Sequence, residues 1–406
     1  MIQTRPGPAI AAAAALLLVA GCGGGSVSVG LPTDAGGTTP AGTRIEVLAT
    51  STRGLGNLVY KDGAAWVSMS NSTTGGSAVM KTPLPLQASS RWTEVPLGAC
   101  ALASSANEET ARTPALRALG SNLWLFQSAH ERQQGQAGEH GLCTLDASGS
   151  FAARDLPLEN CIGGWCAPLA MNELKLFNNR LYSNAGAGQN LFVSTDAAAS
   201  WRVALGQFDS MICTHQAFEV VGDRLLVGGE CPLDFAYIRA YKLGADGLPA
   251  SKDELPVSLP TLENRNVQFI QQVANTQRVF AGVEGGLLRS DDGGQSFKFV
   301  IQQPLSGNTG YPYIRYFVAL SGKPDTMVVG GFDKARALPY LAWSADGGTS
   351  WTDISSLLPG YARAAGDTAF AEVSSVSEDP QGRVIVTVNL KNGSEGRVLL
   401  LTLVKS

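Results

Sequence analysis

One pattern recurs seven times along the chain: a polar or glycine turn, followed by an apolar residue that opens a short strand. Turn residues placed directly before a strand are typical of tight hairpins. The apolar positions recur every 44 to 58 residues, and the mean interval is 53. They are Trp66, Trp124, Leu181, Leu225, Val279, Met327 and Val384. Repeats of this length, rich in strands and turns, indicate propeller blades. Each turn is expected to join the first and second strands of a blade.

A second motif follows several of these positions. Residues 290–297 and 344–351 read S-x-D-x-G-x-[ST]-[WF], residues 194–201 carry Ala198 in place of the glycine, and residues 144–151 are a weaker copy. The motif resembles the Asp-box, or BNR, repeat of sialidases, sortilin-type receptors, reducing-end xyloglucanases and photosystem II assembly factors. Its carboxylate can accept backbone N–H groups across a tight turn, where glycine supplies a positive φ. We therefore interpret Asp146, Asp196, Asp292 and Asp346 as structural rather than catalytic.

The two patterns together predict one all-β domain over residues 43–406, a seven-bladed β-propeller with four-stranded antiparallel blades. The last blade has three strands of its own before the sequence stops. Residues 44–50 read as a further strand that could complete it, which would link the two ends and remove exposed strand edges. Six or eight blades remain as alternatives.

The first 42 residues indicate export and anchoring. Residues 9–20 form an apolar run too short to span a bilayer as a helix, so residues 1–21 are interpreted as a signal peptide. Val19-Ala20-Gly21-Cys22 resembles the bacterial lipobox, which implies lipidation of Cys22; an ordinary signal peptide is the alternative. Gly23, where an aspartate would imply inner-membrane retention, implies the outer membrane. Residues 22–42 are expected to be a Gly/Ser/Thr/Pro-rich tether, and the protein is expected at the bacterial cell envelope.

Six cysteines remain besides Cys22, and an even number in an exported chain suggests disulfides. Fifteen pairings are possible for six cysteines. We favour Cys161 with Cys166, Cys213 with Cys231, and Cys100 with Cys143. Metal binding is the rival interpretation, but the sequence has no C-x-x-C pair and its three histidines show no ligand spacing. No metal and no cofactor are expected.

The charge pattern argues against one class of partner. The net charge is −4, and no cluster of Lys and Arg alternates with aromatic residues. A surface that follows a nucleic-acid backbone is therefore not expected. We expect a monomer that touches the membrane only through its lipid.

Long loops between blades are where a propeller usually carries its function. The arginine cluster that sialidases use to bind the substrate carboxylate is not recognisable, although Arg315 stands in a suitable late position. Another glycosidase would need only two carboxylates, and Glu230, Glu284 and Asp333 follow the ends of second strands. They are the candidates for catalysis.

A binding function demands less of the sequence. Trp165, Tyr311 and Tyr313 lie in predicted face loops, and with Arg315 they are candidates for contact with a protein or a glycan. Packing between blades is the alternative role for these aromatic residues. The leading hypothesis is an envelope-anchored, non-catalytic binding or assembly scaffold that presents one propeller face to a partner. A carbohydrate-active hydrolase is the alternative, so the sequence leaves open whether the protein is an enzyme.

Overall fold

The computed structural model describes residues 42–105, 111–127, 132–133, 139–154, 159–162, 165–168, 171–185, 190–206, 213–231, 235–262, 265–305, 311–364 and 366–404. For residues 132–133, 159–162, 165–168, 171–172, 185 and 235, only the backbone is described. The chain divides after Thr33 into two units, and all described residues belong to the second, Asp34–Ser406. The predicted lipidation site Cys22 and the predicted signal peptide lie outside the described residues.

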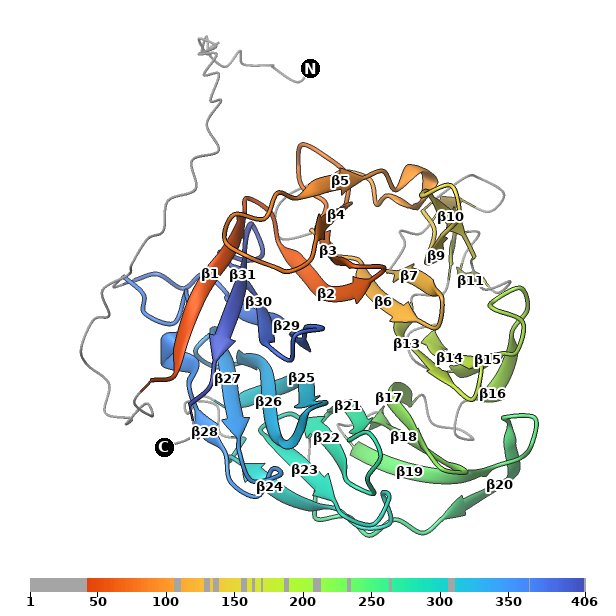
Figure 1. Cartoon of the computed structure of the whole chain (residues 1–406). Helices are drawn as coiled ribbons and strands as arrows, with labels where there is room; N and C mark the ends of the chain where they lie inside the picture. The colour runs from red at the N-terminus through yellow and green to blue at the C-terminus, as the bar shows by residue number, and fades with distance from the viewer. Residues whose placement is uncertain are drawn as a thin grey trace, which may run out of the picture. The chain divides into compact units, whose positions relative to one another are not determined.

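Seven four-stranded antiparallel sheets form the blades of a propeller, and Figure 1 shows them arranged around a common centre. The strands of each blade are named below in their spatial order, from the innermost to the outermost. In blades 1 to 6 this is also their order along the chain. Blade 1 contains β2 (Leu55–Lys61), β3 (Ala64–Met69), β4 (Ala78–Pro83) and β5 (Thr93–Val95), and blade 2 contains β6 (Ala115–Leu119), β7 (Asn122–Phe126), β9 (Leu142–Leu145) and β10 (Phe151–Ala153). Blade 3 contains β13 (Met171–Phe177), β14 (Arg180–Ala185), β15 (Asn190–Ser194) and β16 (Arg202–Leu205), and blade 4 contains β17 (Thr214–Val221), β18 (Arg224–Cys231), β19 (Phe235–Leu243) and β20 (Pro249–Leu255).

The remaining three blades complete the ring. Blade 5 contains β21 (Val267–Gln272), β22 (Val279–Val283), β23 (Gly286–Ser290) and β24 (Lys298–Gln302), and blade 6 contains β25 (Pro312–Leu320), β26 (Lys323–Asp333), β27 (Leu338–Ser344) and β28 (Thr352–Asp353). Blade 7 contains β29 (Glu372–Glu378), β30 (Val384–Leu390), β31 (Glu395–Thr402) and β1 (Arg44–Ser51). The prediction of seven blades is confirmed, and the alternatives of six or eight are wrong.

The repeated turns also lie where they were predicted. All seven apolar positions fall in the second strands of their blades, from Trp66 in β3 to Val384 in β30. The N-terminal strand β1 pairs antiparallel with β31, from Arg44 opposite Thr402 to Ser51 opposite Gly396. The two ends of the propeller are thus joined by one ladder of backbone hydrogen bonds, which closes the ring.

The hydrophobic core lies between neighbouring blades. Phe280 of blade 5 packs with Phe317 and Met327 of blade 6, and Val328 of blade 6 packs with Val373 of blade 7. Because each sheet is covered on both faces, a second strand can be apolar throughout, as in β22, whose five residues are all buried. Burying a side chain such as Phe280 contributes roughly 1.5–3 kcal/mol.

One small sheet was not predicted. β8 (Arg132–Gln133), β11 (Glu159–Ile162) and β12 (Trp165–Pro168) form a three-stranded sheet, and β12 contains Trp165, which was predicted to lie in a face loop. Its strands are two to four residues long, which is too short for a periodic pattern to show in the sequence. In the described part of the chain the helical segments are the single 3-10 turns η1 (Gly98–Cys100) and η3 (Ser355–Leu357), and no helix there could cross a bilayer.

Two of the three predicted disulfides are present. Cys100 after β5 is bonded to Cys143 in β9, which joins blade 1 to blade 2. Cys213 and Cys231 bond the start of β17 to the end of β18 within blade 4. The backbones of Cys161 and Cys166 lie opposite each other in the β11–β12 pair, and their side chains are outside the described residues.

Candidate functional site

The propeller has two faces, which we name by their features. The box face carries the turns between first and second strands and between third and fourth strands. The mouth face carries the turns between second and third strands and the connections between blades. The three clearest Asp-boxes, including the copy with Ala198, connect third to fourth strands, so they lie on the box face.

The box aspartates are occupied by hydrogen bonds within their own turns. In blade 5, Asp292 Oδ1 accepts the backbone N–H groups of Gln295 and Ser296, each at 2.9 Å, and the Ser290 hydroxyl at 2.7 Å. Burial opposes the charged form of Asp292, but these hydrogen bonds outweigh it and lower its pKa to about 2. Asp346 in blade 6 repeats the arrangement, also with a pKa of about 2. Such carboxylates stabilise turns and stay ionised, so they are poor general acids.

The box turns also fill the junctions between blades. A side chain at Gly294 would come within 2.5 Å of Leu226 in blade 4, and one at Gly348 within 2.6 Å of Phe280 in blade 5. Each turn therefore lies directly on the second strand of the preceding blade. The copy in blade 3 keeps this geometry with alanines, and Ala197 and Ala198 have φ values of 55° and 70°.

A cavity of about 700 Å³ occupies the centre of the ring and opens on the mouth face. The innermost strands of all seven blades contribute side chains to it. They are Asn57, Arg117, Glu173, Gln216, Gln268, Arg315 and Glu372. Sequence reasoning predicted Arg315 as a binding residue, and the structure places it in this wall.

Two arginine–glutamate pairs make the cavity polar. Arg117 forms a bidentate pair with Glu173, with Nε–Oε1 at 2.9 Å and Nη2–Oε2 at 3.0 Å. Arg315 is held more loosely, with Nη1 at 3.7 Å from Glu372 Oε2 and two-fifths of its side chain exposed. Tyr316 belongs to the same network, and burial raises its pKa to about 12.

The two glutamates titrate in opposite directions. Burial raises the pKa of Glu372, and the loose contact with Arg315 only partly offsets it. Burial would also raise the pKa of Glu173, but the charges of Arg117 and Lys175 lower it below its usual range. The surroundings therefore disfavour the charged form of Glu372 and favour the charged form of Glu173.

Asparagine side chains form hydrogen bonds with backbone groups at the edges of the inner strands. Asn389 of β30 accepts the backbone N–H of Leu55 at 2.7 Å and donates to the Leu55 carbonyl at 3.0 Å. Asn57 makes the same two-way contact with Leu116 of the next blade. These amides satisfy backbone groups that have no partner strand on the channel side. Consequently much of the polar lining has a structural role, and the two ion pairs are the main charged groups that face the cavity.

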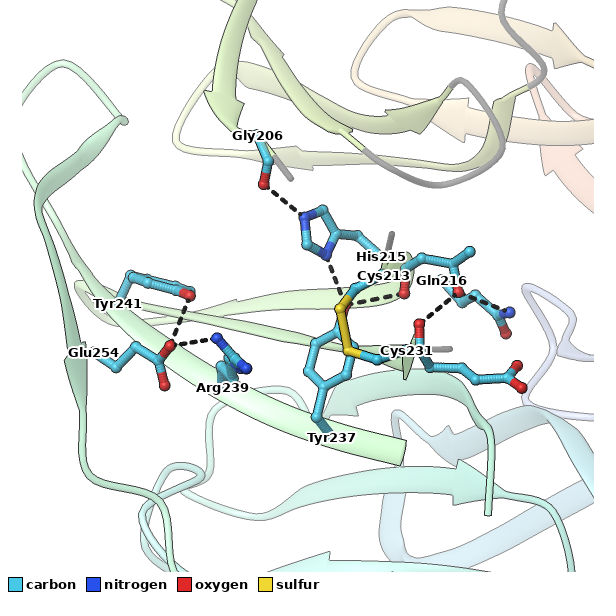
Figure 2. Close-up of a disulfide and its surroundings, with 11 residues drawn as sticks. Gly206, Cys213, His215, Gln216, Cys231, Tyr237, Arg239, Tyr241 and Glu254 are labelled. Carbon is cyan, nitrogen blue, oxygen red and sulfur yellow. Dashed lines mark hydrogen bonds and ion pairs between the residues drawn. A yellow bond between two sulfur atoms is a disulfide. The ribbon is translucent and has the colours of Figure 1, made fainter. Parts of the chain in front are cut away.

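The disulfide of blade 4 stiffens one sector of the mouth face. Figure 2 shows Cys213–Cys231 beside His215 and Tyr237. His215 Nδ1 lies 2.7 Å from the Tyr237 hydroxyl and Nε2 lies 3.0 Å from the Gly206 carbonyl. Burial lowers the pKa of His215. This buried network ties blade 4 to the preceding blade and fixes the strand that presents Gln216 to the cavity.

The aromatic candidates form a stack at the edge of the cavity. Tyr313 lies parallel to Phe332 with 4.9 Å between ring centroids, and the guanidinium of Arg315 lies 4.9 Å from the Phe332 centroid. Tyr311 is buried and donates its hydroxyl to Glu284 at 2.7 Å. Only the backbone of Trp165 is described, so its side chain lies outside the described residues. The structure thus brings Tyr313 together with Arg315 and Tyr311, and it places Tyr311 against the predicted acidic residue Glu284.

The predicted acidic candidates all have partners in the structure. Asp333 is buried and forms an ion pair with Arg336 at 2.7 Å. Glu284 is buried and is bound by Tyr311 and by Lys334, the latter at 3.3 Å. Glu230 accepts a hydrogen bond from Asn266. None of the three belongs to the cavity lining, and among the described residues no group of three or more His, Cys, Asp or Glu could hold a metal ion.

Sequence reasoning missed the cavity carboxylates. Glu173 and Glu372 stand near the starts of the innermost strands β13 and β29, as Arg315 does in β25. That shared position, directly after a blade-to-blade connection, was the available signal. This position alone could not identify the cavity residues, because an inner strand begins with polar residues whether or not their side chains meet across the channel.

The sequence matches no family model and no curated protein. Among solved structures, the chain is similar to YCF48 bound to a D1 peptide, at 12% identity over 90% of this chain and 97% of that chain, with a TM-score of 0.51. It is also similar to YCF48 from Cyanidioschyzon merolae, at 11% identity over 88% and 98% of the two chains, with a TM-score of 0.52. A GH74 xyloglucanase from Xanthomonas campestris matches at 12% identity over 87% of this chain and 75% of that chain. Its TM-score of 0.38 is too low to support a structural or functional conclusion. The two YCF48 likenesses agree with the fold described above, a seven-bladed β-propeller, and do not show the ligand.

Proposed function

We propose that this protein is a binding propeller that takes a polypeptide segment of a partner protein at the mouth of its central cavity. The observation that carries this proposal is the cavity of about 700 Å³, to which every blade contributes a side chain. A polypeptide offers both N–H donors and carbonyl acceptors. An arginine–glutamate pair and neutral amides such as Gln268 can satisfy both kinds of group.

The mouth combines the features that recognition sites use. Arg315 offers a half-exposed guanidinium on an aromatic stack, and arginine and tyrosine are enriched among residues that dominate binding energy. Its loose contact with Glu372 leaves donors that can turn toward a ligand. One protein with this fold, YCF48, was solved bound to a D1 peptide, which supports a protein as the class of partner. We place the protein at the bacterial envelope, anchored through lipid on Cys22, and Cys22→Ser should release it from membranes.

Site-specific photo-crosslinking of the full chain in the cells that produce it tests the proposal. A photoreactive residue at position 268 lines the cavity, while one at Val203 lies on an outer strand where the native side chain is 49% exposed. The expected result is a crosslinked protein adduct from position 268 that is absent at 203 and reduced by Arg315→Ala. Equal adducts at both positions, or none at 268, would contradict the proposal.

A hydrolase remains a second candidate because of one observation. Glu372 and Glu173 line the same cavity, and their surroundings raise the pKa of the first and lower that of the second. A glycosidase needs such a division between an acid and an ionised carboxylate. A screen of glycans and chromogenic glycosides tests this, with Glu372→Gln and Glu173→Gln as the decisive variants and Glu230→Gln as the control. Turnover that both decisive variants abolish, and the control retains, would replace the binding-only interpretation with catalysis.

A further inference from the structure

Three ion pairs on the mouth face share one arrangement. In each of them a basic side chain of blade 6 lies toward solvent and its acidic partner lies further inside; the pairs are Lys334–Glu284, Arg336–Asp333 and Arg315–Glu372. The Lys334 side chain is 53% exposed and that of Glu284 is 10% exposed. The difference is larger in the second pair, at 51% for Arg336 and 3% for Asp333. A ligand that approaches this sector of the mouth face therefore meets the cations first.

Three pairs on the box face have the opposite arrangement. There the acid is the more exposed partner, and the pairs are Lys61–Asp62, Arg278–Asp325 and Arg289–Asp291. Arg383 and Asp379 are an exception on that face, since this aspartate is buried. The net charge of the whole chain is −4. The outward cations of blade 6 are therefore a local feature of the mouth face and do not follow from the composition of the chain.

The aromatic stack at the mouth positions two of these cations. Lys334 Nζ lies 5.3 Å from the ring centroid of Tyr313 and donates to its hydroxyl at 3.2 Å. The guanidinium of Arg315 lies 6.0 Å from the same centroid and 4.9 Å from that of Phe332. The rings of Tyr313 and Phe332 are stacked in parallel. Both cations are thus placed by one packed pair of rings, at the edge of the central cavity that Arg315 lines.

Hydrogen bonds hold the third cation in the turn between β26 and β27. Arg336 donates its backbone N–H to Asp333 Oδ1 at 2.8 Å, and its Nε and Nη2 donate to Oδ2 at 2.9 and 2.7 Å. The carboxylate of Asp333 is therefore engaged within its own turn. Arg363, from the connection to blade 7, donates to the carbonyls of Ala337 and Gly360. It adds a fourth cation beside the same turn.

Four basic residues thus form one surface, which we name the cationic rim: Arg315, Lys334, Arg336 and Arg363. Asp367, in the same connection as Arg363, is an exposed acid, and its carboxylate accepts the backbone N–H of Ala369 at 2.9 Å. The attraction between two charges falls with their separation. A carboxylate that reaches the rim is therefore attracted by the outward cations more strongly than it is repelled by the acids behind them.

We propose that the cationic rim binds acidic side chains of the polypeptide segment taken at the mouth, so the partner carries Asp or Glu residues beside the part that enters the cavity. This inference rests on the proposed binding function and specifies the chemistry of its partner. Arginine can bind a carboxylate through two parallel N–H groups, whereas lysine acts as a point charge. Arg315 and Lys334 contact their own acids at 3.7 and 3.3 Å, which leaves donors available to a ligand.

Fluorescence anisotropy with three labelled peptides of one length tests the charge preference on the full chain. The peptides repeat Glu-Gly-Tyr, Gln-Gly-Tyr or Lys-Gly-Tyr, so they share a backbone and their tyrosines and differ in charge. At about 0.1 M salt we expect the Glu peptide to bind about tenfold more tightly than the Gln peptide, and the Lys peptide to bind most weakly. At about 1 M salt the Debye length falls from about 10 Å to about 3 Å, so most of this preference should disappear.

Variants of one ion pair locate the effect. Lys334→Gln should weaken binding of the Glu peptide about tenfold. The double variant with Lys334→Gln and Glu284→Gln should show the same loss, because it removes the cation without leaving a buried carboxylate unpaired. Lys298→Gln is the matched control, since Lys298 is also exposed and paired with an aspartate but lies in the outer strand β24. This control should bind the Glu peptide as the wild type does.

Each other outcome overturns the inference. Equal affinity for the Glu and Gln peptides would refute the charge preference and leave the proposed binding function standing. Recovery of binding in the double variant would show that Lys334→Gln acts through an unpaired Glu284. An equal loss in Lys298→Gln would show a general attraction to the surface of the protein. If none of the three peptides binds, the inference is wrong, and crosslinking from position 268 then decides separately on the proposed function.

Discussion

The alanines in the box of blade 3 provide a sharp test of how these turns are stabilised. Ala197 has a φ of 55° and an exposed side chain, in a position where the full motif tolerates any residue but the backbone is left-handed. A non-glycine residue in this region costs about 1–2 kcal/mol. Alanine recovers about 0.4–1 kcal/mol relative to glycine because it restricts the unfolded chain. Ala197→Gly should therefore stabilise the protein by about 0.5–1 kcal/mol.

The neighbouring alanine gives a different expectation from the same reasoning. Ala198 has a φ of 70° but is 4% exposed and packs in the core between blades 2 and 3. Glycine would relieve the same strain and lose a buried methyl group, which contributes about 0.8 kcal/mol. The two effects nearly cancel, so Ala198→Gly should change stability by less than about 0.5 kcal/mol. Ala250 is exposed on the outer strand β20 without a positive φ, and Ala250→Gly should cost about 0.5–1 kcal/mol.

Urea unfolding of the oxidised protein, followed by tryptophan fluorescence, measures all three variants against the wild type. The expected order of midpoints is Ala197→Gly above the wild type, Ala198→Gly close to it and Ala250→Gly below it. An unchanged slope is required if the shift is to report stability alone. A midpoint for Ala197→Gly as low as that for Ala250→Gly would refute the argument from backbone strain.

Three further predictions follow from contacts in the ring. Asn389→Leu leaves two backbone groups of Leu55 unpaired, its N–H and its carbonyl, and each such buried group costs about 1–3 kcal/mol. The free energy of unfolding should therefore fall by about 2–6 kcal/mol in a urea titration; a fall below about 1 kcal/mol would mean that water replaces the amide. Asp346 has a folded pKa of about 2 against an ordinary 3.8, so its contribution is complete above about pH 4 and is lost as pH falls through 2. When the free energy of unfolding is measured as a function of pH, Asp346→Asn should reduce its decrease between pH 4 and pH 2. The same pH dependence in this variant and the wild type would contradict the role given to Asp346. Replacing both Cys213 and Cys231 with serine opens a loop of 18 residues and should cost about 3 kcal/mol in chemical unfolding, while a variant as stable as the wild type would show that the buried His215 network alone holds blade 4.

The fold could be predicted from the sequence because its signals are local. A hairpin turn, a box of eight residues and the strand beside each one are set by interactions over a few residues, so seven repetitions could be counted directly. The closing strand followed because a propeller with a three-stranded last blade requires one from elsewhere. The pairs Cys100–Cys143 and Cys213–Cys231 were favoured among fifteen possible pairings, and the structure confirms both.

The binding site depends on contacts that no local pattern encodes. Arg117 and Glu173 come from adjacent blades, while Arg315 and Glu372 come from the other side of the ring, and only closure brings them to one cavity. The acids chosen from the sequence, such as Asp333, stand at the correct ends of strands but are neutralised by partners in the tertiary structure. The sequence by itself predicted seven repeats and the turns that stabilise them, because these depend on short-range geometry, and the tertiary structure excluded six or eight blades. Only the tertiary structure decided which charges face the central cavity, because that depends on how seven distant strands meet around one axis.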